Sequence, residues 1–148
     1  MRSKKESEAL ASLEEAFQLC VDLANEDPLA FIDAAVERLI MLLNARYVNL
    51  GNPQRTLKFN QQLVSLWYAV VDAKPNDVHA QHLLARAHEG LGLASAEMNI
   101  DEKAAESFEA ALRILRPLVQ ADSENSSLER SLDRVTEHLD SLSSLATN

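Results

Sequence analysis

Apolar residues recur every three or four positions along almost the whole chain, the spacing that places side chains on one face of an α-helix. Leu10, Leu13, Phe17 and Ala24 form the first such stripe, and later stripes follow at similar spacing. Each periodic segment has about 20 residues, which is roughly 30 Å of helix, and the connections between segments are short. The pattern predicts an all-α fold of about six helices, with consecutive helices antiparallel because the connections are so short.

The few helix-breaking residues mark where the helices begin. Asp27-Pro28 and Asn52-Pro53 each place a capping side chain before a proline, which is tolerated in a first helical turn. Acidic side chains are favourable near a helix N-terminus, and three further segments carry them. We therefore expect helices to begin near Pro28, Pro53, Asn76, Asp101 and Glu124.

The pattern of apolar residues and helix starts repeats along the chain after a fixed number of residues, which we call the displacement. This displacement carries Leu43 onto Leu91 and Leu91 onto Leu139, and the helix-start signals coincide under it as well. A helix hairpin cannot bury its apolar face alone, so stacking completes the core. We predict a single domain, 1–148, with a covering helix over 1–26, repeats over 28–73 and 76–121, and a capping helix over 124–146.

Composition supports this fold class and narrows the possible partners. The chain has 148 residues with only 3 Gly and 4 Pro, which gives strands and tight turns little to build on. Its 14 basic and 23 acidic residues argue against nucleic acid or an anionic membrane surface as a partner. The densest apolar run, Leu39 to Leu43, is too short for membrane insertion. With the single Cys20 and no readable leader, we expect a cytoplasmic protein.

One segment resembles a known repeat family. Leu91-Gly92 lies on one predicted helix, and Ala104, Phe108 and Ala111-Leu112 lie on the next. This arrangement is similar to a tetratricopeptide repeat (TPR), in which small residues let two helices approach and an aromatic ring fills the remaining space. The resemblance implies antiparallel hairpins stacked as a short right-handed superhelix with a concave groove. In the earlier repeat, Thr56 and Asn60 stand where the small residue and the aromatic would be.

The resemblance also implies a partner-binding surface. Arg38, Arg86 and Arg134 share one repeat position, which in that family faces the concave groove, where basic groups hold carboxylates of a bound peptide. The alternative is that the three arginines are solvated beside acidic neighbours. Six further residues are expected in or beside the groove: Met41, Ala45, Glu89, Gly90, Leu93 and His138.

Two glycines and one proline inside helices need a reason, because each weakens a helix. Gly92 matches the helix-contact glycine of the family. Gly90 either leaves room for a ligand side chain in the groove or relieves packing. Pro117 lacks a backbone donor, so we expect it to kink or end its helix near Arg116.

The chain offers little for catalysis or metal binding. His79, His82 and His88 lie in one polar helical segment without a nearby Cys, so we expect no metal site. There is no Gly-rich phosphate loop and no Gly-x-Ser-x-Gly turn. We therefore expect no enzyme activity and no cofactor.

These observations favour an adaptor or scaffold that binds an acidic or amphipathic segment of another protein in its groove. The first alternative is a self-associating homodimer, because the second helix carries extra apolar residues, namely Leu29, Phe31, Ile40 and Leu42. The second alternative is a ligand-binding helical bundle, which would need polar groups facing the interior.

Overall fold

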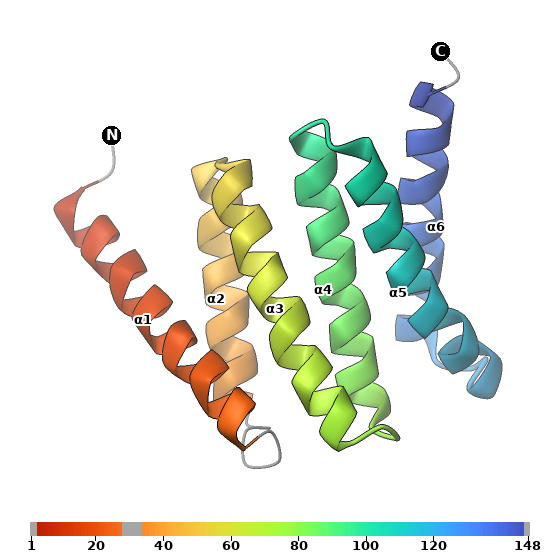
Figure 1. Ribbon diagram of the computed structural model, residues 1–148, viewed down its shortest axis with the longest axis horizontal. Helices are drawn as coiled ribbons and strands as arrows, with labels where there is room; N and C mark the ends of the chain where they lie inside the picture. Colours follow the sequence, from red (N-terminus) through yellow and green to blue (C-terminus); the bar gives the residue numbers. More distant parts are fainter. Residues whose placement is uncertain (1–2, 28–33, 147–148) are drawn as a thin grey trace.

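The computed structural model describes residues 3–27 and 34–146, and within these ranges the chain forms six α-helices and no strands (Figure 1). The all-α prediction is confirmed for this part of the chain. The helices are α1 (Lys4–Glu26), α2 (Ala34–Leu50), α3 (Pro53–Ala73), α4 (Val78–Glu97), α5 (Asp101–Ala121) and α6 (Ser126–Ala146). None of these helices is both long enough and apolar enough to cross a membrane.

Side-chain caps set several of the helix starts. The side-chain oxygens of Asn52 and Asp77 accept hydrogen bonds from backbone N–H groups three residues on, at 3.2 Å and 3.0 Å, and Asn125 does the same for Leu128 at 3.2 Å. The predicted starts at Pro53 and Asp101 are confirmed, whereas α4 and α6 begin two residues later than predicted because Asp77 and Asn125 are the capping residues. The predicted start at Pro28 lies outside the described residues.

Pro117 does not end its helix. Of the two predicted effects, a kink or an end near Arg116, the end is wrong, because α5 continues to Ala121 with the proline inside it. A proline removes the backbone hydrogen bond to the carbonyl four residues earlier, here that of Arg113. This loss falls in the last turns of α5, and Pro117 itself is exposed to solvent.

The helix bounds recur at the displacement seen in the sequence. That displacement carries both ends of α3 onto the ends of α5, and it carries the start of α4 at Val78 onto the start of α6 at Ser126. The turns before α3 and α5 correspond as well, since Gly51 has a φ of 61° and Asn99 a φ of 60°. Glycine and asparagine are the residues that tolerate this left-handed backbone conformation best.

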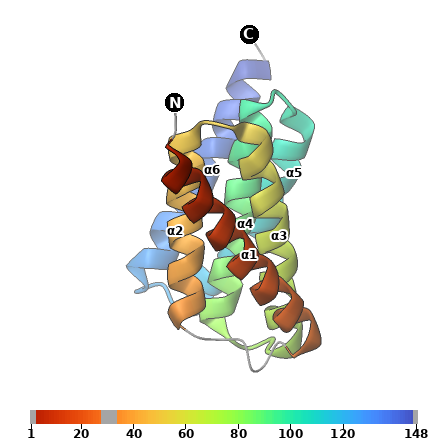
Figure 2. The same cartoon turned by 90° about the vertical axis from the view of Figure 1, so that its left-hand side faces the viewer.

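The helices lie in two layers. Helices α2, α4 and α6 run in one direction on one side, α3 and α5 run in the opposite direction on the other, and α1 crosses the end of the stack diagonally (Figures 1 and 2). Helix α4 packs closely against α3 and α5 and also touches α6. In the described part of the chain, however, no Cα atom of α2 lies within 8 Å of one in α4.

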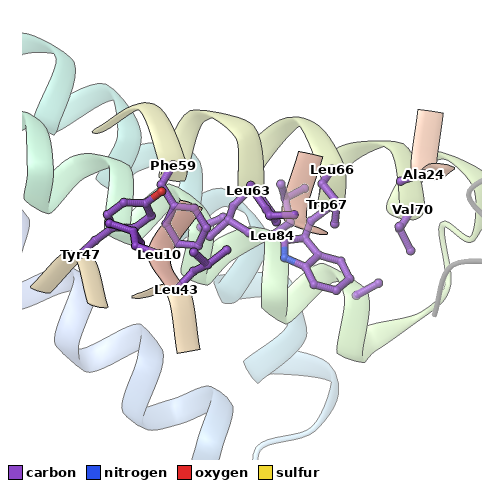
Figure 3. Close-up of a cluster of buried hydrophobic side chains, with 13 residues drawn as sticks. Leu10, Ala24, Leu43, Tyr47, Phe59, Leu63, Leu66, Trp67, Val70 and Leu84 are labelled. Atoms are coloured by element: carbon purple, nitrogen blue, oxygen red, sulfur yellow. The ribbon is translucent and has the colours of Figure 1, made fainter. Parts of the chain in front are cut away.

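Two clusters of buried apolar side chains hold the layers together. The first joins α1, α2, α3 and α4 (Figure 3), and in it the ring of Phe59 lies 5.1 Å from that of Phe17 and 5.0 Å from that of Tyr47. The second joins α4, α5 and α6 around Phe108. In this second cluster a Cβ added at Gly92 would lie 2.6 Å from the Phe108 ring, so α4 and α5 approach closely only because position 92 has no side chain.

Candidate functional site

A cavity of about 470 Å³ lies on the α2, α4 and α6 side of the molecule, with part of α3 as its floor. The floor carries Thr56, Asn60, Leu63 and Trp67. We call this the central cavity. Seven of the nine residues that the sequence predicts for a partner-binding groove line it: Met41, Arg86, Glu89, Gly90, Leu93, Arg134 and His138.

Arg38 and Ala45 are the two residues of the predicted groove that do not line the central cavity. Helix α2 presents Glu37, Met41 and Asn44 to the cavity instead. Successive residues of an α-helix are rotated by about 100°, so Arg38 and Ala45 follow the lining residues onto the adjacent, exposed flank of α2.

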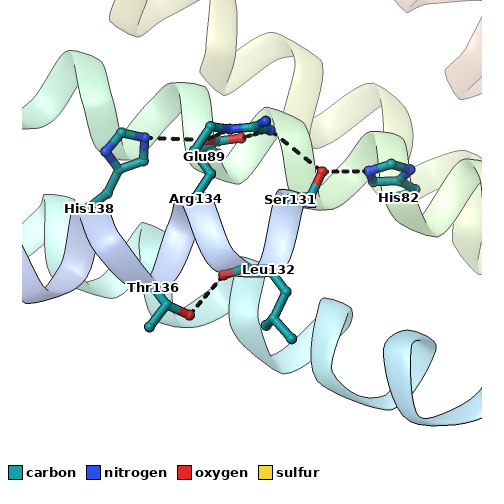
Figure 4. Close-up of polar contacts among 7 residues, drawn as sticks. All are labelled: His82, Glu89, Ser131, Leu132, Arg134, Thr136 and His138. Carbon is teal, nitrogen blue, oxygen red and sulfur yellow. Dashed lines mark hydrogen bonds and ion pairs between the residues drawn. The ribbon is translucent and has the colours of Figure 1, made fainter. Parts of the chain in front are cut away.

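Arg134 is engaged by a carboxylate of its own chain. Its guanidinium donates from Nε to Oε2 of Glu89 at 2.5 Å and from Nη2 to Oε1 at 2.8 Å (Figure 4). The Glu89 side chain is only 8% exposed, while that of Arg134 is 45% exposed. The hydrogen bond to Glu89 is the main cause that raises the pKa of Arg134. Of the three arginines at this repeat position, Arg38 thus lies outside the cavity, Arg134 is paired with Glu89, and Arg86 lines the cavity.

The ion pair belongs to a longer polar network between α4 and α6. His138 Nε2 lies 3.4 Å from Glu89 Oε2, and Arg134 also donates to the hydroxyl of Ser131 at 3.5 Å. The same hydroxyl oxygen of Ser131 lies 2.9 Å from His82 Nε2 (Figure 4). The network therefore fastens the capping helix to the centre of the stack by buried and half-buried polar groups. The sequence carries no local signal for it, because 45 residues separate Glu89 from Arg134.

Gly90 makes room for the chain's own packing. A Cβ added at Gly90 would overlap the side-chain amide of Asn60. Asn60 is buried, and its Nδ2 donates to the backbone carbonyl of Thr56 at 2.9 Å. Of the two explanations that the sequence left open for Gly90, this contact favours the packing one.

The three histidines of α4 have separate surroundings. His79 Nε2 lies 2.7 Å from Glu37 Oε1 and so links α4 to α2, whereas His82 contacts Ser131 on α6. His88 is half-buried on the side of α4 near Arg113. Within the described ranges, no three His, Cys, Asp or Glu side chains are arranged to hold a metal ion.

Stability is expected to fall as the pH is lowered below about 6.5, the ordinary pKa of histidine. Burial lowers the pKa of His82, helped by the nearby charges of Arg86, His79 and Arg134, and burial with Arg113 lowers the pKa of His88. In the window below 6.5 the unfolded chain therefore binds more protons than the folded one, so protonation favours unfolding.

Each histidine contributes at most about 1.4 kcal/mol per pH unit to this slope. Urea unfolding of wild type, His82→Gln and His88→Gln between pH 7.5 and 5 measures it, and each variant should show a shallower decline. Identical pH dependence in all three proteins would contradict the prediction.

The central cavity combines exposed apolar side chains, Met41 from α2 and Leu93 from α4, with Arg86, which belongs to none of the ion pairs among the described residues. Such a surface suits an apolar segment that carries an acidic group beside it.

Comparison with known proteins finds no relative of this chain: no protein-family model, no curated protein and no solved structure matches it.

Proposed function

We propose that this protein is a non-catalytic interaction adaptor that binds a segment of another protein along the central cavity. We further propose that its helices form a short right-handed TPR-like superhelix, with α2–α3 and α4–α5 as the hairpins. The recurrence of helix bounds at one constant displacement supports the repeat. The close contact between Gly92 and Phe108 supports the resemblance, because those two residues occupy the small and aromatic positions of the family pattern.

The observation that carries the proposal is an uncovered apolar surface at the cavity. Met41 is 71% exposed and Leu93 40% exposed, and both line the cavity together with Leu63 and Trp67. Large apolar side chains that line a concave surface are typical of protein-binding sites. Truncation of such an anchor commonly costs more than about 1 kcal/mol of binding free energy, which is more than a fivefold loss of affinity.

Retention of a specific partner should depend on these two side chains. The double variant Met41→Ala/Leu93→Ala is expected to lose at least tenfold in affinity for any protein that wild type retains specifically from an extract of its source cells. The matched control is Leu19→Ala/Leu23→Ala, which removes two leucines that are 64% and 56% exposed on α1, outside the cavity. The partner is identified by mass spectrometry and its affinity measured by titration. Equal affinity for wild type and the cavity variant would refute the proposal.

Self-association is the second candidate, because apolar side chains are also exposed away from the cavity. Leu19 and Leu23 on α1 and Leu42 on α2, which is 51% exposed, belong to this group. Ile40 instead packs against the first core cluster and lines the cavity, and Leu29 and Phe31 lie outside the described residues. Sedimentation equilibrium at several concentrations distinguishes the candidates, since a homodimer through α1 would dissociate in the Leu19→Ala/Leu23→Ala variant.

A further inference from the structure

Two helices present the same residue spacing to the central cavity. Beside Ile40, the residues that line it from α2 are separated by four, three and four positions, and these are Glu37, Met41, Asn44 and Val48. The same spacing recurs on α4, in the row Arg86, Gly90, Leu93 and Glu97. An alternation of three and four is the spacing with which a helix contacts another helix along a coiled-coil seam. Each wall of the cavity therefore carries the contact row of a helix.

The backbones of the two helices that carry these rows stay apart. Helices α2 and α4 run in the same direction, and in the described ranges none of their Cα atoms come within 8 Å, whereas α4 and α6 touch directly (Figures 1 and 2). Packed helices normally have axes about 8–10 Å apart. Helix α3 lies beneath the gap, and the hydrogen bond between His79 and Glu37 closes one end of it. The rows thus border a space that no helix of the described chain fills.

A helix suits this space better than an extended peptide. The backbone N–H and C=O groups of α2 and α4 are paired within their own helices, so an added strand would find no edge with which to pair. A helix brings its own backbone hydrogen bonds and needs only side-chain contacts. Because α2 and α4 are parallel, a third helix antiparallel to both also has the favourable dipole arrangement.

The charged residues at the two ends of the α4 row indicate which charges a bound helix should carry at its own two ends. Arg86 and Glu97 are both exposed, and neither belongs to an ion pair in the part of the chain that the structure describes. Glu37, the acidic residue of the α2 row, is already hydrogen-bonded to His79. Arg86 and Glu97 lie eleven positions apart, which is about 16 Å along a helix and nearly the same face of it. Opposite charges with the same separation on a facing helix would pair with both.

We propose that the occupant of the central cavity is one amphipathic α-helix of a partner protein, antiparallel to α2 and α4. It carries a basic residue opposite Glu97 and, eleven residues later, an acidic residue opposite Arg86. Apolar residues four and seven positions after the basic one contact Leu93 and Met41, respectively. This inference rests on the proposed function and specifies its partner.

The test is a selection of peptides from a library of helical peptides, each about five turns long, whose contact face is fully randomised. Synthetic copies of the enriched clones are titrated against wild type and variants by fluorescence anisotropy at low salt. We expect the enriched clones to carry the basic and acidic residues eleven positions apart. Arg86→Glu should weaken binding about tenfold, and replacing the acidic residue of the peptide by lysine should restore it. Arg38→Glu, on the flank of α2 outside the cavity, should change affinity less than twofold.

The other possible results show whether the helix proposal alone fails or the adaptor function fails with it. If the enriched peptides bind Arg86→Glu as tightly as wild type, the helix proposal is overturned. The adaptor function then still stands provided that Met41→Ala/Leu93→Ala abolishes binding. If no clone binds, the helix proposal is overturned, and the adaptor function is decided by retention of a partner from the extract. If that double variant binds like wild type, both proposals fall. If sedimentation shows wild-type dimers that Met41→Ala/Leu93→Ala dissociates, a second copy fills the cavity and the partner helix is wrong.

Discussion

The Arg134→Met variant is expected to lose about 3 kcal/mol of its free energy of unfolding. The substitution keeps much of the side-chain volume but removes both hydrogen bonds to the Glu89 carboxylate, which is 8% exposed. Among the described residues, the ion-pair partner left to that buried charge would be His138, at 3.4 Å from Glu89 Oε2. A carboxylate that loses its partner keeps its desolvation cost, so the loss exceeds the value of the pair itself. Urea unfolding at pH 7 measures the difference.

The control is removal of both partners. Glu89→Met/Arg134→Met leaves no unpaired buried charge, so its free energy of unfolding should return to within about 1 kcal/mol of wild type. Glu89→Met alone should cost less than Arg134→Met, because the Arg134 guanidinium, in a side chain 45% exposed, can turn to water. If Arg134→Met is as stable as wild type, or if the double variant is as unstable as Arg134→Met, the pair does not hold α6 against α4.

The helices and most of their bounds could be predicted from the sequence because they depend on local physics. A capping side chain acts on an N–H three residues away, as Asn52 does for Arg55, and an apolar stripe spans a few turns. The difference at Pro117 also has a local cause, because the position of a proline within a helix decides whether the helix continues past it. Here α5 keeps its last turns.

The faces of the helices were predictable only in part. The displacement that carries Leu43 onto Leu91 also relates the helix bounds of the two repeats. The residues that line the cavity follow a displacement one residue longer. Under it Met41 of α2 corresponds to Gly90 of α4, not to Glu89. The aromatic residues shift in the same way, since Phe59 rather than Asn60 fills the first core cluster and matches Phe108 in the second. In the α2–α3 hairpin, which lacks the family pattern, the residues that face the core and the cavity are thus shifted by one position relative to the α4–α5 hairpin. This rotation is what moved Arg38 and Ala45 out of the cavity.

The polar network at the cavity could not be read from the sequence at all. Periodicity indicates which residues share a helix face, but not which carboxylate meets which guanidinium across two helices. Glu89 and Arg134 were both expected in the groove, as groups that would face a partner. Their pairing with each other follows from the direct contact between α4 and α6. It leaves Arg86 as the arginine lining the cavity that has no ion pair among the described residues.

Phe108→Ala is expected to lose about 3–5 kcal/mol of the free energy of unfolding, the largest single effect we predict. The Phe108 side chain is 1% exposed, it fills the space that Gly92 leaves between α4 and α5, and its ring stacks on that of His138 at 5.4 Å. Truncation would leave a cavity in the second core cluster and loosen the contacts of α4 with α5 and α6. Phe108→Leu keeps most of the volume and should lose less than half as much.

Gly92→Ala tests whether the ring and the missing side chain depend on each other. In wild type the added Cβ would lie 2.6 Å from Cε1 and 2.7 Å from Cδ1 of Phe108, so we expect a loss of about 1–3 kcal/mol even though alanine favours helix. In the Phe108→Ala background that ring is gone, and the same substitution should stabilise the protein by up to about 1 kcal/mol. Urea unfolding of the four proteins measures this change of sign. The same effect of Gly92→Ala in both backgrounds would mean that something other than the ring of Phe108 requires glycine at this position.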